Sequence, residues 1–209
     1  MDVTRTEEEQ IEALKKWWSE NGWYIVAGII IGLTAVFGWR YWLEYQNRIA
    51  EQASDLYAGM VVDVRQKKFT EARTLADRIL AEYPDTTYAS FAALMLGKLD
   101  VTDNNLDNAQ KHLQWVLDNS KQDELKHLAR TRLARVLLAA GKDDAAMKLI
   151  DNIDHGEFAA TYQEIKGDIY MHQNKTEEAR KAYQLALSSS IAGGKPKPFL
   201  EMKIENLGR

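Results

Sequence analysis

An uncharged run of 17 residues, 23–39, interrupts a chain in which 28% of the residues are Asp, Glu, Lys or Arg. As a helix this run would be about 25 Å long, near the lower limit for crossing the hydrocarbon core of a bilayer. Tryptophan and tyrosine rings, which collect at membrane interfaces, extend the run at both ends. These rings are Trp17, Trp18, Trp23 and Tyr24 on one side and Trp39, Tyr41 and Trp42 on the other. The pattern predicts a single transmembrane helix over residues 22–42.

Three other structures compete for this apolar run: a core helix of a soluble protein, a cleaved signal peptide and a helix lying in the membrane interface. A core helix seldom carries aromatic rings at both ends. A signal peptide is disfavoured because the preceding region is long and acidic, and Phe37, Gly38 and Trp39 stand where a small-residue cleavage site would be. An interfacial helix needs a polar face, which residues 23–39 lack. A spanning anchor is therefore the preferred interpretation.

The basic residues that flank the run indicate its direction across the membrane. Three precede it and two follow it, and Lys and Arg are enriched on the cytoplasmic side. They are Arg5, Lys15 and Lys16 before the run and Arg40 and Arg48 after it. We therefore expect residues 1–21 to form a cytoplasmic tail and residues 43–209 to lie on the far side of the membrane. The formal net charge is -4, so nothing in the charge balance indicates nucleic-acid binding.

Gly28 and Gly32 form a GxxxG pair inside the apolar run. Small residues four positions apart let two transmembrane helices approach each other closely. Glycine is also frequent in membrane helices in general. Two interpretations therefore stay open: a contact with another transmembrane helix, including that of a homodimer, and coincidence.

From about residue 48 onward, every apolar run has helical spacing. Four alanines recur at separations of 37, 37 and 33 residues, namely Ala72, Ala109, Ala146 and Ala179. Twelve residues before three of them stands another small residue, and these are Gly97, Ala134 and Gly167. A period near 34 built from two helices resembles the tetratricopeptide repeat. Such units cannot bury their apolar faces alone, so they stack into a solenoid.

The two ends of the repeat region differ from its middle. The first unit matches the repeat only in its second helix, which leaves open whether residues 45–68 form a full unit or an extended stalk. At the other end, residues 199–207 place Leu200, Ile204 and Leu207 on one helical face, suited to covering the last unit. The sequence thus predicts an all-α fold: one N-terminal transmembrane helix followed by a tetratricopeptide-repeat solenoid with a C-terminal capping helix. An unrelated helical bundle is the alternative.

In stacked repeats the first helix of each unit lines a groove that can bind an extended peptide or an amphipathic helix. By repeat position we predict ten groove residues, apolar at one end, basic in the middle and acidic in the last unit. They are Tyr57, Val61, Phe91, Leu94, Lys98, Thr131, Arg135, Glu164, Asp168 and His172. Because contact residues that dominate binding are a minority of any interface, some of the ten are expected to be packing residues.

The chain offers little catalytic chemistry. It contains no cysteine, and its four histidines lie neither three nor four residues from one another, so no thiolate or histidine metal motif exists. Paired acids such as Asp143-Asp144 open helices, where carboxylates favour the positive end of the helix dipole. We therefore expect no catalytic residue, no cofactor and no bound metal, and we expect the protein not to be an enzyme.

Several stretches of the chain resemble the YfgM-like proteins of Gram-negative bacteria, and the resemblance covers nearly the whole sequence. These stretches are Glu20-Asn21-Gly22, Gly38-Trp39-Arg40-Tyr41-Trp42, Leu133-Ala134-Arg135-Val136 and Glu201-Met202-Lys203-Ile204-Glu205-Asn206-Leu207. The resemblance implies a single-pass inner-membrane protein with a short cytoplasmic tail and a periplasmic repeat domain. It also implies an ancillary role at the SecYEG translocon, with a PpiD-like periplasmic chaperone as partner. A scaffold or assembly factor of another envelope complex is the alternative function.

Overall fold

The computed structural model describes residues 7–151, 153, 156–192 and 198–207, and every regular element in this part of the chain is helical. The α-helices are α1 (Glu7–Arg65), α2 (Phe69–Glu82), α3 (Thr87–Thr102), α4 (Leu106–Asn119), α5 (Asp123–Ala139), α6 (Asp143–Asp151), α7 (Ala159–His172), α8 (Thr176–Ala192) and α9 (Pro198–Asn206). A short 3-10 helix, η1 (Gly156–Phe158), precedes α7. The chain divides into two compact units, residues 1–49 and residues 50–209.

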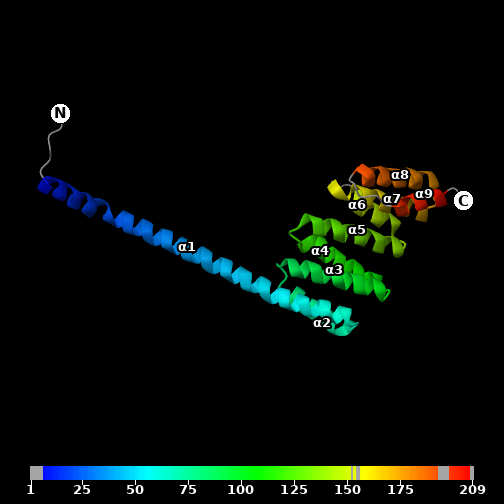
Figure 1. The fold of residues 1–209 in the computed structure, drawn as a ribbon, viewed down its shortest axis with the longest axis horizontal. Helices are drawn as coiled ribbons and strands as arrows, with labels where there is room; N and C mark the ends of the chain where they lie inside the picture. The colour runs from blue at the N-terminus through cyan, green and yellow to red at the C-terminus, as the bar shows by residue number, and fades with distance from the viewer. Residues whose placement is uncertain (1–6, 152, 154–155, 193–197, 208–209) are drawn as a thin grey trace, which may run out of the picture. The chain divides into compact units, whose positions relative to one another are not determined.

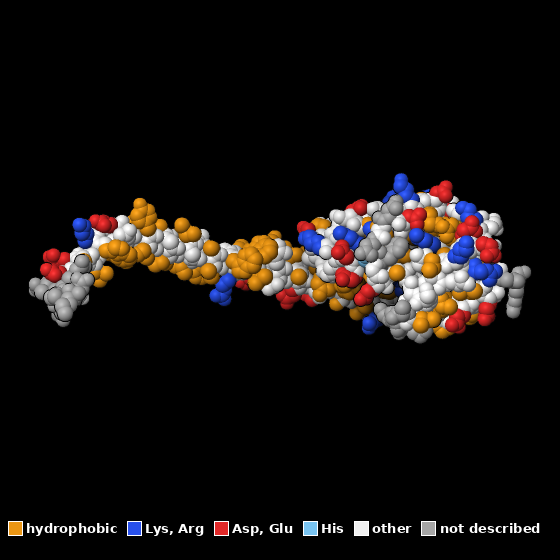
Figure 2. Space-filling view, turned by 90° about the horizontal axis from the view of Figure 1, so that it is seen from above, with side chains coloured by type: hydrophobic (Ala, Val, Ile, Leu, Met, Phe, Trp, Pro, Cys, Tyr) orange, Lys and Arg blue, Asp and Glu red, His pale blue; other side chains and the backbone are white. Residues whose placement is uncertain are grey.

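Residues 7–49 of the first unit all belong to α1, which is the one described helix long and apolar enough to cross a membrane. Only 6% of its most apolar window is buried, and Figure 2 shows hydrophobic side chains over its surface. A core helix of a soluble protein would bury this surface, so the exposure favours the membrane interpretation. Because α1 runs without interruption from Glu7 to Arg65, the boundaries at residues 22 and 42 stay a prediction.

In the second compact unit, which starts at residue 50, residues 50–65 of α1 form the first helix of the first repeat. Ala53 and Met60 are fully buried, and Met60 shares a core cluster with Ala72, Ala76 and Ile79 of α2. In this first repeat the small residue at the helix contact is Gly59. A Cβ at this position would lie 3.3 Å from Leu75 Cδ1 of α2, so the two helices approach closely there. The first repeat is therefore a helix pair, made of residues 50–65 of α1 and of α2, and its first helix is part of the repeat and not only a stalk.

The remaining pairs are α3–α4, α5–α6 and α7–α8, stacked in chain order as Figure 1 shows, and α9 packs against α8. All four recurrent alanines are fully buried, as are the small residues expected twelve positions earlier. Leu200 of α9 is also fully buried, in one cluster with Ala179, Tyr183 and Ala186 of α8. The predicted all-α repeat solenoid with a capping helix is confirmed.

The turn inside each pair repeats with the same period as the alanines. Residues 67, 104, 141 and 174 have positive φ angles of 61, 57, 69 and 61°. In each turn the next residue donates a backbone hydrogen bond to the carbonyl five positions earlier, as Asn105 does to Asp100 at 2.7 Å. Asn and Gly adopt this left-handed conformation most readily, and they occupy three of the four positions. Lys67 is the exception, in the unit that matches the repeat least well.

Helix pairs approach closely where a glycine faces a large side chain. At Gly167 a Cβ would lie 2.3 Å from Tyr183 Cε1, and at Gly97 it would lie 3.1 Å from Leu113 Cγ. The aromatic ring lies directly against Gly167 and, being rigid, cannot shift as an aliphatic side chain can. Glycine at position 167 is therefore a packing requirement.

We expect Gly167→Ala to lower the free energy of unfolding by about 1–3 kcal/mol, because the new methyl group overpacks the Tyr183 ring. Gly97→Ala should cost less than about 1 kcal/mol, since Leu113 can shift and alanine favours the helix. Urea unfolding of the full-length protein in detergent, followed by circular dichroism, measures both. Equal costs at the two positions would contradict this explanation.

Candidate protein-binding groove

The groove surface is built from the first helix of each unit, and the ten predicted residues lie on α1, α3, α5 and α7. Two of them are not at the surface. Leu94 is 5% exposed and belongs to a core cluster, and Thr131 is 3% exposed, with its hydroxyl donating to the Leu128 carbonyl at 2.9 Å. Both face neighbouring helices of the stack, so they belong to the core and not to the exposed surface that repeat position alone indicated.

At the first end of the groove, aromatic rings form a cluster between α1 and α3. The ring centroids of Tyr57 and Phe91 lie 5.7 Å apart, and Tyr88 lies 5.7 Å from Tyr57 and 6.3 Å from Phe91. Val61 is half-buried against the same core. Half-buried aromatic rings provide large contact areas at low entropic cost, so this end suits apolar side chains of a partner. The sequence prediction of groove residues did not include Tyr88, because Tyr88 lies one helical turn before the repeat position that Phe91 occupies.

In the middle of the groove a pocket of about 350 Å³ lies between α3 and α5. Its lining is Gly97, Lys98, Val101, Thr102, Leu113, Arg132, Arg135 and Val136. The predicted residues Lys98 and Arg135 are exposed at this pocket, and Arg132 joins them from the preceding turn of α5. Burial lowers the pKa of Arg132, and the nearby charge of Arg135 acts in the same direction. We name this site the basic pocket.

At the last end, the chain's own C-terminal helix holds the predicted acidic residues. Lys203 of α9 lies 2.6 Å from Asp168 and 3.3 Å from Glu164. The Tyr183 hydroxyl donates to Asp168 at 2.7 Å, and burial, aided by this bond, raises the pKa of Tyr183 well above its usual range. Both acidic residues therefore have a cationic partner within the chain. The sequence showed that α9 covers the last unit, but not that its lysine reaches the groove residues.

His172 lies apart from the other groove residues. Its Nδ1 is 2.8 Å from the Asp143 carboxylate at the start of α6. Its side chain is 54% exposed, so the contact is a surface interaction between neighbouring units. Arg135, by contrast, reaches toward α7, where its Nη2 lies 3.9 Å from Glu164. The structure thus brings together the basic middle and the acidic end of the groove.

A second, larger hollow of about 660 Å³ lies over α4, α5 and α6, on the side of the second helices. Its basic lining residues are Lys111, Arg130 and Lys148. Lys111 contacts Asn108 at 3.4 Å, and the side chain of Arg130 hydrogen-bonds to Tyr162. No groove residue that the sequence predicted lines this hollow. Its lysines therefore serve as controls for the groove.

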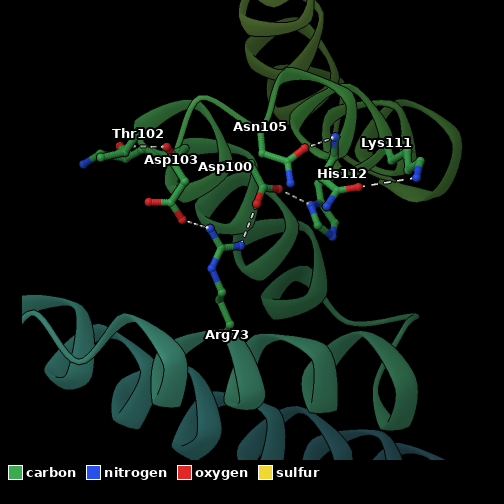
Figure 3. Close-up of polar contacts among 9 residues, drawn as sticks. Arg73, Asp100, Thr102, Asp103, Asn105, Lys111 and His112 are labelled. Carbon is green, nitrogen blue, oxygen red and sulfur yellow. Dashed lines mark hydrogen bonds and ion pairs between the residues drawn. The ribbon is translucent and has the colours of Figure 1, made fainter.

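One polar cluster is buried outside the groove, and Figure 3 shows how its side chains converge. Asp100, 2% exposed, lies between Arg73 Nη1 at 2.6 Å and His112 Nδ1 at 2.7 Å. Arg73 also contacts Asp103 at 2.7 Å. These pairs join α2, α3 and α4, and each charged group is matched by another, so the cluster stabilises the stack. Among the residues that the structure describes, no three His, Asp or Glu side chains group as metal ligands.

Residues 15–209 match the family described as a tetratricopeptide repeat-like domain. The chain is similar to the ancillary SecYEG translocon subunit of Escherichia coli K12, at 32% identity over 99% of both chains. A protein of the same name from Neisseria gonorrhoeae is 32% identical over 96% of this chain and 97% of its own. Among solved structures, a tetratricopeptide repeat protein from Parabacteroides merdae shares the fold, with a TM-score of 0.52 at 17% identity. That match covers 75% of this chain and 58% of the other.

We expect Asp100→Asn to lower the free energy of unfolding by about 2 kcal/mol, because it removes the charge that Arg73 and His112 share in a buried place. Asp103→Asn is the matched control: this side chain is 58% exposed, so its loss should cost less than about 0.5 kcal/mol. Urea unfolding of the full-length protein gives both values. Equal losses of unfolding free energy for Asp103→Asn and Asp100→Asn would show that burial does not decide how much each ion pair stabilises the fold.

Proposed function

The chain belongs to the tetratricopeptide repeat-like family of the ancillary SecYEG translocon subunits, and from this premise we propose that it is a membrane-anchored protein-interaction module at the translocon. The observation that carries the proposal is the groove: its aromatic cluster and basic pocket stay open, while its acidic end is covered by α9. An open surface with both apolar and charged parts suits recognition of protein segments.

The proposed topology places residues 1–21 in the cytoplasm, residues 22–42 in the inner membrane and residues 43–209 in the periplasm. Its support is the exposed apolar surface of α1 and the three-to-two excess of basic residues before the span. In this arrangement the groove meets chains on the side where they leave the channel. We further propose a PpiD-like periplasmic chaperone as the partner that receives them, as the family resemblance implies.

Site-specific photocrosslinking in intact membranes tests the proposal. Photoreactive residues replace Phe91, Lys98 and Arg135 in the groove, and a control replaces Lys181, which is exposed on α8. We expect crosslinks to translocon or chaperone subunits from the groove positions and at least tenfold less product from the control. The contrast follows because groove residues would be buried at the contact and the control residue would stay in water.

Two outcomes would contradict this function. Equal labelling from Lys181 would mean that the groove is not the contact surface. Labelling from the groove of a different envelope complex, with no translocon or chaperone subunit, would favour the alternative role as a scaffold or assembly factor of that complex.

A second, structural role rests on α1. A Cβ at Gly28 or Gly32 would meet no atom within 4 Å, so this face of the helix has room for another helix. We expect the double substitution Gly28→Leu and Gly32→Leu to reduce a detergent-stable homodimer at least fivefold, because bulky side chains prevent close backbone approach. Gly38→Leu is the control, since Gly38 has the same open surroundings outside the motif. Crosslinked dimer on gels is the readout, and an unchanged dimer fraction would exclude this contact.

A further inference from the structure

The basic pocket gathers three cationic side chains, Lys98, Arg132 and Arg135, from two neighbouring helices. Several other cations of the repeat domain have carboxylate partners: Arg73 with Asp100, Lys166 with Asp151 at 2.6 Å, and Lys203 with Asp168. In the basic pocket, by contrast, no carboxylate of the described residues contacts Lys98 or Arg132. Positive charge is therefore gathered there without a matching anion.

Arg132 is the central case. Its Nη1 donates a long hydrogen bond, 3.5 Å, to the Leu94 carbonyl, and its side chain is half-buried. The other guanidinium, Arg135, is 3.9 Å from Glu164, but that carboxylate is closer to Lys203 at 3.3 Å. A half-buried guanidinium beside a second one is costly without an anion, because both burial and like charge oppose it. An incoming carboxylate would relieve both costs.

The floor of the pocket is apolar. Val101 is 45% exposed, and Leu113 and Val136 lie beneath the surface at 2% and 6% exposure. Gly97 contributes no side chain, and Leu113 lies directly against it. The volume of about 350 Å³ suits one or two side chains rather than a folded surface. The pocket therefore offers apolar contact and positive charge within the reach of neighbouring residues of one peptide.

We propose that the basic pocket is the specificity site of the groove and binds a protein segment in which an acidic side chain stands next to an apolar one. The proposal rests on the proposed function, since it names the chemistry of the segments that the groove accepts. The acidic side chain lies between Arg132 and Lys98, and the apolar one contacts Val101 and Val136. The two arginines can form forked, two-point hydrogen bonds with a carboxylate, which a neutral amide cannot reproduce.

Fluorescence anisotropy with the full-length protein in non-ionic detergent tests the proposal. Three labelled peptides, blocked at both ends, share a Gly-Ser background and carry Leu-Glu, Leu-Gln or Ala-Glu at the centre. We expect the Leu-Glu peptide to bind at least tenfold more tightly than the Leu-Gln peptide and about threefold more tightly than the Ala-Glu peptide. Equal Kd values for Leu-Glu and Leu-Gln would overturn the proposal.

Matched variants locate the effect. Arg132→Gln should reduce the preference for Glu over Gln to less than about twofold, whereas Arg132→Lys should retain part of it because the charge remains. Lys111→Gln, on the side of the second helices, should leave the preference unchanged. Urea unfolding of each variant verifies that the repeat domain is folded. A preference that survives Arg132→Gln, or falls equally with Lys111→Gln, would show that the pocket is not the source.

Other anions are tested as competitors. A Leu-Gln peptide that keeps a free C-terminal carboxylate should bind no better than the Leu-Gln peptide blocked at both ends. Glycerol phosphate should not displace the Leu-Glu peptide. Success of either competitor would reassign the pocket to chain ends or to lipid headgroups and overturn the proposal. Crosslinks from positions 98 and 135 distinguish failure of the proposed function from failure of the proposed peptide preference. If these crosslinks to translocon subunits persist but the peptides bind equally, only the proposed pocket chemistry is refuted. Discrimination without translocon crosslinks would refute only the proposed location.

Discussion

The close approach of two helices within each unit is the constraint on which the rest of the repeat domain depends. Gly97 and Gly167 let Leu113 and Tyr183 lie directly against the backbone of the partner helix, and Gly59 does the same for Leu75. At this separation each pair presents two continuous apolar faces that only the neighbouring pairs can cover. The left-handed turn residue, five positions before each recurrent alanine, returns the chain at the angle that this packing needs. Lys67 carries that conformation without the glycine or asparagine that favours it.

The stack ends differently on its two sides, and each end shapes the groove. At the first repeat, α1 supplies Tyr57 to the aromatic cluster, so this one helix contains both the apolar run and part of the candidate groove. At the last unit α9 buries Leu200 and extends Lys203 to the acidic residues of α7. In the middle of the groove Arg135 lies 3.9 Å from Glu164, a carboxylate that Lys203 approaches more closely, at 3.3 Å. Closure of one end thus leaves the basic pocket as the open charged surface.

Buried charge has two roles in this chain. Asp100 is surrounded by its partners, so its charge holds three helices together. Arg132 is half-buried beside Arg135 without such a partner, and its burial lowers its pKa instead of being offset by a carboxylate. Buried charge with partners therefore stabilises the stack around Asp100, whereas the half-buried charge of Arg132 is the basis of the proposed peptide binding.

The sequence by itself determined the apolar run with its aromatic ends, the helical period, the recurrent alanines and the capping helix. Each of these is a local pattern, set by helix geometry along one segment. Only the tertiary structure decided which repeat positions are exposed: Leu94 and Thr131 turned into the core because the rotation of each helix depends on both of its neighbours. The structure also decided the partners of charged groups. Lys203 is 35 residues from Asp168 and Arg73 is 27 from Asp100, and no local spacing relates side chains that stacking alone brings together.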